Sequence, residues 1–334
     1  MCRDKHRRAL PSRCEEDQET KKEKAMTLTK PRHVTIFGGS GFVGRHIVRA
    51  LAKTGVQIRV AIRKPNEALF LKTAGRVGQI ELMQVNICDP SSVKRALEGT
   101  EAVINAVGIL FETGSQKFDS VQAIGAANVA KLAKKAGIKT FIHISAIGAD
   151  LNSASLYAQS KARGEQAVMK SIPTAIVLRP SLVIGPEDDF FNRFAQMASL
   201  APFLPLIGGG KTLYQPVQVY DLAACVVAAI GAGEDKAGCY HIGGPRIYSF
   251  KALMELLLAQ IGRKTLLLPM PYWAAGLIAR IAQFAPKPLL TPDQLIMLRQ
   301  DNIVTGENGL QVFGVDGQSI EAILPDYLAR YRKS

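Results

Sequence analysis

The residues with the clearest chemical potential in this sequence are a tyrosine and a lysine four positions apart, Tyr157 and Lys161. Residues at this spacing share one face of a helix, so the phenol and the ammonium would lie side by side. A free phenol has a pKa of about 10, too high for easy proton exchange at neutral pH, and a neighbouring ammonium would lower it. The spacing therefore predicts that Tyr157 acts as general acid or base and that Lys161 tunes it.

A hydroxyl group is expected beside this pair to hold the substrate oxygen. Ser145, at the end of an expected strand over 140–145, is the candidate. The next residue, Ala146, is an alternative occupant of that position, and Ser153 and Ser155 offer hydroxyls from the following loop. The predicted catalytic set is Tyr157, Lys161 and Ser145.

A cluster of glycines follows an apolar run in VTIFGGSGFVG, residues 34–44. Glycines leave a turn in which backbone amides can approach a pyrophosphate. Apolar positions at helical spacing follow, so a helix N-terminus would face the phosphates. The order of strand, turn and helix predicts a dinucleotide site, and the alternative is a Gly-rich surface turn. The residues predicted for this part of the site are Gly38, Gly39, Gly41, Phe42, Val43 and Gly44.

The end of the second expected strand, over 57–62, bears on the choice between NAD and NADP. NAD sites usually place an acidic residue there to bind the ribose hydroxyls. This chain reads IRVAIRKP, and Arg63 and Lys64 offer two cations that suit a 2′-phosphate. NADP(H) is therefore favoured over NAD(H), and the alternative is that both cations belong to a solvated loop. The ends of the third and fourth strands add Asn86, Ile87, Ala106, Val107 and Gly108 to the predicted nucleotide site.

Short apolar, β-branched runs alternate with helical patterns along most of the chain. This alternation predicts an α/β fold: a doubly wound parallel sheet of Rossmann type with a smaller, mainly helical C-terminal lobe. Strands are expected over 57–62, 80–85, 102–107, 140–145 and 174–178, and helices over 91–97, 116–136 and 155–170. The expected parts are a disordered basic tail over 1–31, a nucleotide-binding domain over 32–185 to which 214–244 returns, and a substrate or partner lobe made of 186–213 and 245–334.

The composition argues against several classes of function. The 334 residues carry a formal net charge of +14, but no nucleic-acid-binding motif accompanies it, so nucleic acid is not an expected partner. The five cysteines have no metal-ligand spacing, which predicts a reducing compartment and no metal site. No apolar run of transmembrane length is free of proline and charge. A cytoplasmic location is expected, with a peripheral position at the inner face of the inner membrane as the alternative.

Residues 265–290 are notably apolar and contain Trp273, with charges only at Arg280 and Lys287. The expected interpretation is a core helix of the second lobe. Two alternatives remain open: a face that docks on a membrane or a membrane complex, and the lining of a site for an apolar, quinone-like substrate.

Together these motifs resemble the short-chain dehydrogenase/reductase superfamily, in its extended or atypical branch. The matching segments are GGSGFVG at 38–44, NAVG at 105–108, YAQSK at 157–161, LRPSLVIGP at 178–186, QPVQVYDLA at 215–223 and YHIGGP at 240–245. The resemblance implies a Tyr–Lys–Ser catalytic set and a backbone contact to the nicotinamide near Pro180 and Ser181.

Within that superfamily the chain is similar to the nucleotide-binding accessory subunit family of respiratory complex I, alpha subcomplex subunit 9, and its bacterial relatives. The similarity rests on FGGSGFVGRHIV, AIRKP and FIHISAIGAD. It implies NADPH as the cofactor and, in that family, a structural role for the nucleotide. Three functions therefore stay open: an NADP(H)-dependent oxidoreductase, a non-catalytic subunit that holds NADPH and docks on a respiratory membrane complex, and a nucleotide-sensing regulator.

Overall fold

A parallel sheet of seven strands organises the computed structural model, which describes residues 31–285, 288 and 290–332. The expected tail over 1–31, apart from its last residue, lies outside the described residues. The strand order is β11-β6-β5-β4-β1-β2-β3, and it reverses between β1 and β4, where doubly wound folds bind ligands. The strands are β1 (His33–Phe37), β2 (Gln57–Ile62), β3 (Ile80–Gln84), β4 (Ala102–Asn105), β5 (Thr140–Ile144), β6 (Ile176–Pro180) and β11 (Gly238–Ile242).

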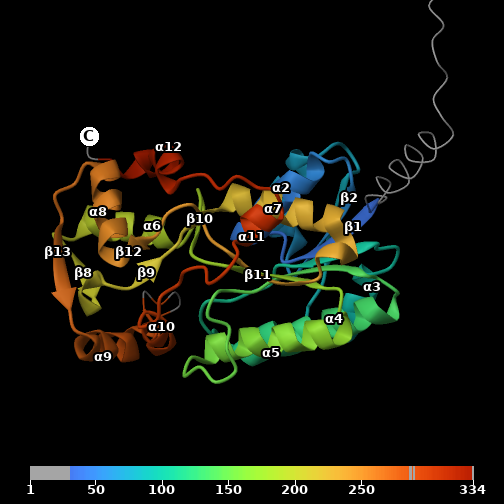
Figure 1. The fold of residues 1–334 in the computed structure, drawn as a ribbon, viewed down its shortest axis with the longest axis horizontal. Helices are drawn as coiled ribbons and strands as arrows, with labels where there is room; N and C mark the ends of the chain where they lie inside the picture. The colour runs from blue at the N-terminus through green and yellow to red at the C-terminus, as the bar shows by residue number, and fades with distance from the viewer. Residues whose placement is uncertain (1–30, 286–287, 289, 333–334) are drawn as a thin grey trace, which may run out of the picture. The chain divides into compact units, whose positions relative to one another are not determined.

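Helices cover both faces of this sheet, α2 and α7 on one face and α3, α4 and α5 on the other (Figure 1). Successive residues of a strand point to opposite faces. Ile36 accordingly packs with α2 and α7, whereas Phe37 packs on the other side. A strand that is buried on both faces needs apolar residues at successive positions. The parallel sheet with helices on both faces confirms the predicted doubly wound fold. The helices are α2 (Phe42–Ala52), α3 (Pro90–Ala96), α4 (Gly125–Lys135), α5 (Leu156–Ser171) and α7 (Val219–Ala232).

Three expected elements differ by two or more residues at an end. The fourth strand, expected over 102–107, ends at Asn105. The sixth strand begins at Ile176 and ends at Pro180 instead of covering 174–178. The helix expected over 116–136 begins only at Asp119, with a π-helical turn (Asp119–Ile124) before α4. The reason is local: Gln116 and Thr113 exchange backbone hydrogen bonds and close a separate turn before the helix.

The smaller lobe has its own apolar core. Phe191 of α6, Leu253 and Leu257 of α8 and Leu324 of α12 are fully buried in it. Its main elements are α6 (Phe190–Leu200), β8 (Phe203–Ile207), α8 (Phe250–Ile261), β13 (Leu266–Met270), α9 (Tyr272–Ala282), α10 (Pro292–Met297) and α12 (Leu324–Leu328). Shorter elements elsewhere in the described chain are β7 (Val183–Ile184), β9 (Leu213–Tyr214), β10 (Val217–Gln218), β12 (Tyr248–Ser249), α11 (Gly309–Val312) and the 3-10 helices η1 (Pro65–Ala74), η3 (Gly208–Gly210), η4 (Gly233–Lys236), η5 (Ile320–Ala322) and η6 (Ala329–Tyr331).

The apolar segment 265–290 does not form a core helix. It begins as β13, which pairs in parallel with β8, and continues as α9. Only Ala275 and Ala279 of α9 are buried, while its large side chains are exposed. The core-helix interpretation was wrong because apolar composition does not reveal which face of a helix meets the rest of the protein.

Candidate functional site

The turn after β1 has the geometry of an anion site. Gly38 adopts a φ of +81°, a region that favours glycine. A side chain at Gly44 would place its Cβ 2.2 Å from the Gly38 carbonyl oxygen, so α2 packs against the turn only because residue 44 has none. The N-cap of α2, Gly41, has no side chain to satisfy the first amides of the helix. These amides are therefore available to a diphosphate.

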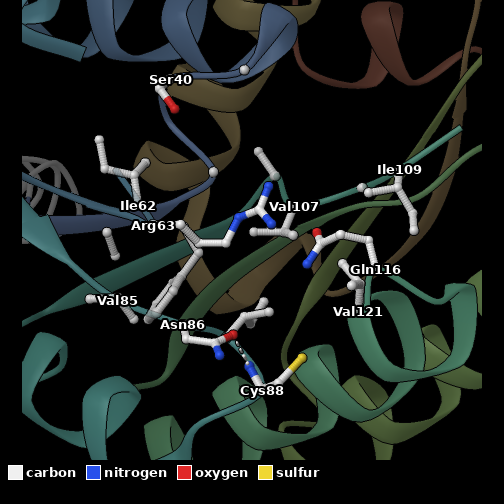
Figure 2. Close-up of a pocket in the computed structure, with 17 residues that line it drawn as sticks. Ser40, Ile62, Arg63, Val85, Asn86, Cys88, Val107, Ile109, Gln116 and Val121 are labelled. Carbon is white, nitrogen blue, oxygen red and sulfur yellow. Dashed lines mark hydrogen bonds between the residues drawn. The ribbon is translucent and has the colours of Figure 1, made fainter. Parts of the chain in front are cut away.

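A cleft opens at the carboxyl ends of β1 to β4, next to this turn (Figure 2). Eight of the predicted nucleotide-binding residues line it: Gly38, Gly41, Arg63, Asn86, Ile87, Ala106, Val107 and Gly108. The other lining residues are Phe37, Ser40, Ala61, Ile62, Val85, Cys88, Ile109, Gln116 and Val121. Backbone amides, one guanidinium and apolar walls in one cleft fit an adenine dinucleotide.

The two cations after β2 differ in position. The Arg63 side chain points into the cleft (Figure 2). Its charge acts on Cys88 on the opposite wall, where burial raises the pKa of the thiol and Arg63 partly offsets this rise. Lys64 is not among the described residues that line the cleft, because its Nζ donates to Glu67 Oε1 at 2.7 Å on the exposed side of the loop. Only Arg63 is therefore placed to meet a phosphate inside the cleft.

Lys161 is buried at the junction of α5 with the ends of β4 and β5. Its Nζ donates to the carbonyl oxygen of Ile144 at 3.2 Å. A Cβ on Gly108 would lie 3.2 Å from the same Nζ, so the ammonium stands beside the last part of the cleft. Burial lowers the pKa of Lys161 to about 8, although Glu165 acts in the opposite direction. The lysine is thus still mainly charged at neutral pH.

Tyr157 is buried one helical turn before Lys161, with its ring edge-to-face against Phe118 at a centroid distance of 5.7 Å. The Lys161 Nζ lies 6.0 Å from the centre of the Tyr157 ring. Burial and the charge of Asp293 raise the pKa of Tyr157 to about 12. The expectation that Lys161 lowers this pKa is wrong here, because loss of solvation of the phenolate dominates.

The candidate serines have different environments. Ser145 follows β5 and is buried, and its Oγ has no hydrogen-bond partner among the described residues. Ser155 caps α5, because its Oγ accepts from the Ala158 amide and donates to Asp293. Ser153 Oγ accepts from the Ser155 amide. Ser145 is the one of these three whose hydroxyl has no hydrogen-bond partner among the described residues.

Several predicted residues lie away from this cleft. Pro180 is the last residue of β6 and Ser181 follows it, and the Ser181 hydroxyl donates to the Asn302 carbonyl oxygen at 2.7 Å. The residues that line the cleft also do not include Gly39 of the turn, Phe42, Val43 and Gly44 of α2, or the predicted catalytic residues Ser145, Tyr157 and Lys161.

A short helix of the smaller lobe, α10, meets the site from the other side. Its Asp293 carboxylate accepts hydrogen bonds from Ser155 Oγ and from the Leu156 amide at 2.7 and 2.6 Å. The side chain of the next residue, Gln294, donates to the carbonyl oxygen of Leu110, which follows β4, at 3.5 Å. Asp293 was not among the residues predicted from the sequence. Its one signal is the TPDQ start of α10, where Thr291 and Gln294 form a capping box.

The sheet order, the glycine turn and the position of the cleft define a Rossmann-type fold, with the cleft where such folds bind dinucleotides. Residues 34–243 match the model of the NAD dependent epimerase/dehydratase family, and the chain belongs to this family. The resemblance to the short-chain dehydrogenase/reductase superfamily is thereby confirmed.

Some known proteins resemble this chain in sequence, and others resemble it in fold alone. The mitochondrial NADH dehydrogenase (ubiquinone) 1 alpha subcomplex subunit 9 of Arabidopsis thaliana is 33% identical over 313 residues, 90% of this chain and 78% of that protein. A protein named ceramide reductase in Caulobacter vibrioides is 33% identical over 195 residues, 58% of this chain and 60% of that protein. The structure of a dTDP-glucose 4,6-dehydratase from Streptomyces venezuelae with NAD bound superposes with a TM-score of 0.67 over 90% of this chain and 97% of that one. At 18% identity it shows the fold alone.

Proposed function

We propose that this chain binds NADP(H) in the cleft and reduces a carbonyl group beside Tyr157, Lys161 and Ser145. One observation carries the proposal: the cleft runs from the uncapped start of α2, past the Arg63 guanidinium, to Gly108, where the buried Lys161 ammonium stands. The phosphate-binding features line this cleft, Lys161 stands next to its Gly108 end, and Tyr157 lies one helical turn before Lys161.

Each residue has a role that follows from its position. The amides of the glycine turn and α2 hold the diphosphate, and Arg63 holds the 2′-phosphate. Lys161, fixed by the Ile144 carbonyl oxygen, is positioned to hold the nicotinamide ribose. The unpartnered Ser145 hydroxyl is suited to donate to the substrate oxygen. When bound, NADPH supplies the hydride that reduces the carbonyl carbon.

The raised pKa of Tyr157 keeps its phenol protonated at neutral pH. Because this pKa is about 12, the phenol keeps its proton and can donate it to the developing alkoxide oxygen. The reverse reaction needs a phenolate, which is costly in this buried position beside the charge of Asp293. An apolar carbonyl compound is the proposed substrate class, in keeping with the relative named ceramide reductase.

A second candidate is a non-catalytic subunit that holds NADPH and sits peripherally on a respiratory membrane complex. The relative named as a subunit of the alpha subcomplex favours it, because the similarity to that protein extends over 90% of this chain. A phenol whose pKa is far from neutrality is also compatible with a packing role for Tyr157.

The first experiment identifies the nucleotide. The full chain is purified and denatured, and any released nucleotide is identified by mass spectrometry. If none is retained, binding of NADPH and NADH is followed by titration calorimetry. We expect NADP(H). A chain that binds neither nucleotide would refute both candidates.

The second experiment separates the two candidates. Tyr157→Phe is compared with Tyr220→Phe, a control on the partly exposed Tyr220 of α7. The assay follows NADPH oxidation with a short-chain quinone and with carbonyl-bearing sphingolipids. A catalytic Tyr157 predicts that Tyr157→Phe loses about a hundredfold or more of the turnover while NADPH affinity is kept, and that Tyr220→Phe is unchanged. Equal turnover in both variants would exclude Tyr157 as the acid, and no turnover above background in the wild type would favour the non-catalytic subunit.

A further inference from the structure

The amphipathic pattern of α9 is inverted. Its small residues Ala275 and Ala279 are fully buried, whereas Trp273, Leu277 and Ile281 are 72%, 56% and 78% exposed. These three large residues are spaced four apart, so they share one face of the helix. A helix of a globular protein normally turns its apolar stripe toward the core. In α9 that stripe faces outward.

The neighbouring ribbon of β8 and β13 extends this surface. Phe203 of β8 is the register partner of Leu266 of β13, and both are exposed. Leu268 lies two residues further along the same face of β13. This face, which we call the apolar face, consists of Phe203, Leu266, Leu268, Trp273, Leu277, Ile278, Ile281 and Phe284. It gathers eight of the nineteen large apolar side chains that are exposed in the described part of the chain.

The two segments that carry the apolar face, 190–220 and 262–292, contain no Asp or Glu in the sequence, although Asp189, Asp221 and Asp293 stand at their borders. Their cations include Lys264, next to β13, and Arg280, within α9, and both are exposed. The formal net charge of the chain is +14. Exposed apolar residues with cations and without carboxylates are complementary to an anionic lipid surface.

We propose that the apolar face docks on an anionic phospholipid bilayer, with α9 lying in the plane of the interface and Trp273 at the level of the headgroups. A second copy of this chain fits less well, because a symmetric contact would bury the cations of both copies in one interface to which these two segments contribute no carboxylate. Among the described residues, none of the helices has the length and apolarity needed to cross a bilayer. The proposed contact is therefore a surface contact.

The test uses the tryptophan of the face as its probe. Trp273 is the only tryptophan of the chain, so its fluorescence reports directly on this surface. The full chain is mixed with phosphatidylcholine vesicles, or with vesicles in which phosphatidylglycerol makes up about a third of the lipid. We expect co-sedimentation with the anionic vesicles and a blue shift of the Trp273 emission. We also expect about tenfold or more weaker binding to phosphatidylcholine alone.

Matched variants locate the contact. Leu277→Glu combined with Ile281→Glu changes two exposed residues of α9 and should weaken vesicle binding by about tenfold or more. The control, Leu69→Glu combined with Val77→Glu, changes two exposed apolar residues of the nucleotide-binding domain and should bind like the wild type. Equal weakening in both pairs would overturn the proposal, and so would an absence of binding by the wild type.

The cations are tested in the same way. Lys264→Ala combined with Arg280→Ala should remove most of the preference for anionic vesicles, whereas Lys53→Ala combined with Lys131→Ala, two exposed cations elsewhere, should keep it. Equal losses would show that net charge, and not this face, drives binding. A wild type that forms dimers lost in the Leu277→Glu, Ile281→Glu variant and ignores vesicles would identify a second copy as the occupant. None of these assays needs nucleotide or turnover, so their outcome is independent of the proposed reaction.

Discussion

The Asp293 carboxylate of the smaller lobe accepts a hydrogen bond from the Ser155 hydroxyl at the start of α5, at 2.7 Å. The same carboxylate accepts from the backbone amide of Leu156 at 2.6 Å. The amino end of a helix carries unsatisfied amides and a partial positive charge, so a carboxylate there is stabilising. Because α5 also carries Tyr157 and Lys161, this contact ties the smaller lobe to the candidate catalytic residues.

Asp293→Asn should lower the free energy of unfolding by about 1 kcal/mol, since the variant keeps the shape of the side chain and loses the charge at the helix end. Urea unfolding of the two proteins measures this difference. The control is Asp316→Asn, because Asp316 is exposed in the loop before η5, and that variant should stay within about 0.5 kcal/mol of the wild type. Equal stabilities for all three proteins would mean that the contact contributes nothing.

Lys161 should make stability depend on pH. Its pKa is about 8 in the folded protein, against 10.5 for the unperturbed group. Between these values the unfolded chain binds the proton more tightly, so the free energy of unfolding rises with pH. The rise from Lys161 amounts to about 3 kcal/mol over that interval. Above pH 10 the ionisation of Tyr157 in the unfolded chain acts in the opposite direction, because its folded pKa is about 12.

Lys161→Met should lower the slope of stability against pH between pH 8 and 10, because it removes the contribution of Lys161, and Lys170→Met, which changes an exposed lysine of the same helix, should keep the wild-type slope. Urea unfolding at several pH values gives the slopes. If the two variants showed the same slope, the burial of Lys161 would not be the cause of the pH dependence.

Arg63 and Lys64 form a natural pair of variants, because one lines the cleft and the other is paired with Glu67 outside it. Arg63→Ala should raise the Kd for NADPH by about tenfold to a hundredfold, since charge-assisted hydrogen bonds to phosphate contribute about 1.5–3 kcal/mol. The Kd for NADH, which lacks the 2′-phosphate, should change little. Lys64→Ala should leave both constants nearly unchanged.

Fluorescence titration of reduced nucleotide measures all four values. A similar loss of NADPH and NADH affinity in Arg63→Ala would show that Arg63 serves the shared part of the nucleotide. A larger loss of NADPH affinity in Lys64→Ala than in Arg63→Ala would reverse the assignment of the phosphate-binding cation.

The sheet and the glycine turn were predictable because their signals are local. Apolar positions at strand spacing give β1 and β2, and the glycines between β1 and α2 mark the turn. Arg63 was also within reach of sequence reasoning, because the carboxyl ends of parallel strands meet at one edge of the sheet. The different positions of the Arg63 and Lys64 side chains could not be predicted, because they depend on the ion pair between Lys64 and Glu67.

Other features of the site depend on contacts between distant residues. Asp293 and Ser155 are 138 positions apart, and no spacing rule connects them. The pKa of Tyr157 follows from the depth of its burial and from Asp293, neither of which the Tyr–Lys spacing reveals. The periodicity of the sequence placed Gln116 inside the expected helix over 116–136. In the structure Gln116 lies in a turn with Thr113 before that helix, and it lines the cleft.

Gly44→Ala should damage both the fold and the nucleotide site. The new Cβ would lie 2.2 Å from the Gly38 carbonyl oxygen and 2.8 Å from Gly39 Cα, and backbone atoms cannot yield as a flexible side chain can. Either α2 moves away from the turn or the turn changes shape, so the free energy of unfolding should fall by about 2 kcal/mol or more. The displaced amides should no longer hold a diphosphate, and nucleotide binding should be lost.

Gly231→Ala is the matched control. Gly231 lies within α7, and a Cβ there meets nothing within 4 Å. Alanine is the better helix former by about 1 kcal/mol, so this variant should be as stable as the wild type or more so, with unchanged nucleotide affinity. Thermal unfolding and NADPH titration of both variants provide the comparison. A Gly44→Ala protein that binds NADPH as tightly as Gly231→Ala would show that the diphosphate does not depend on the close approach of α2 to the turn after β1.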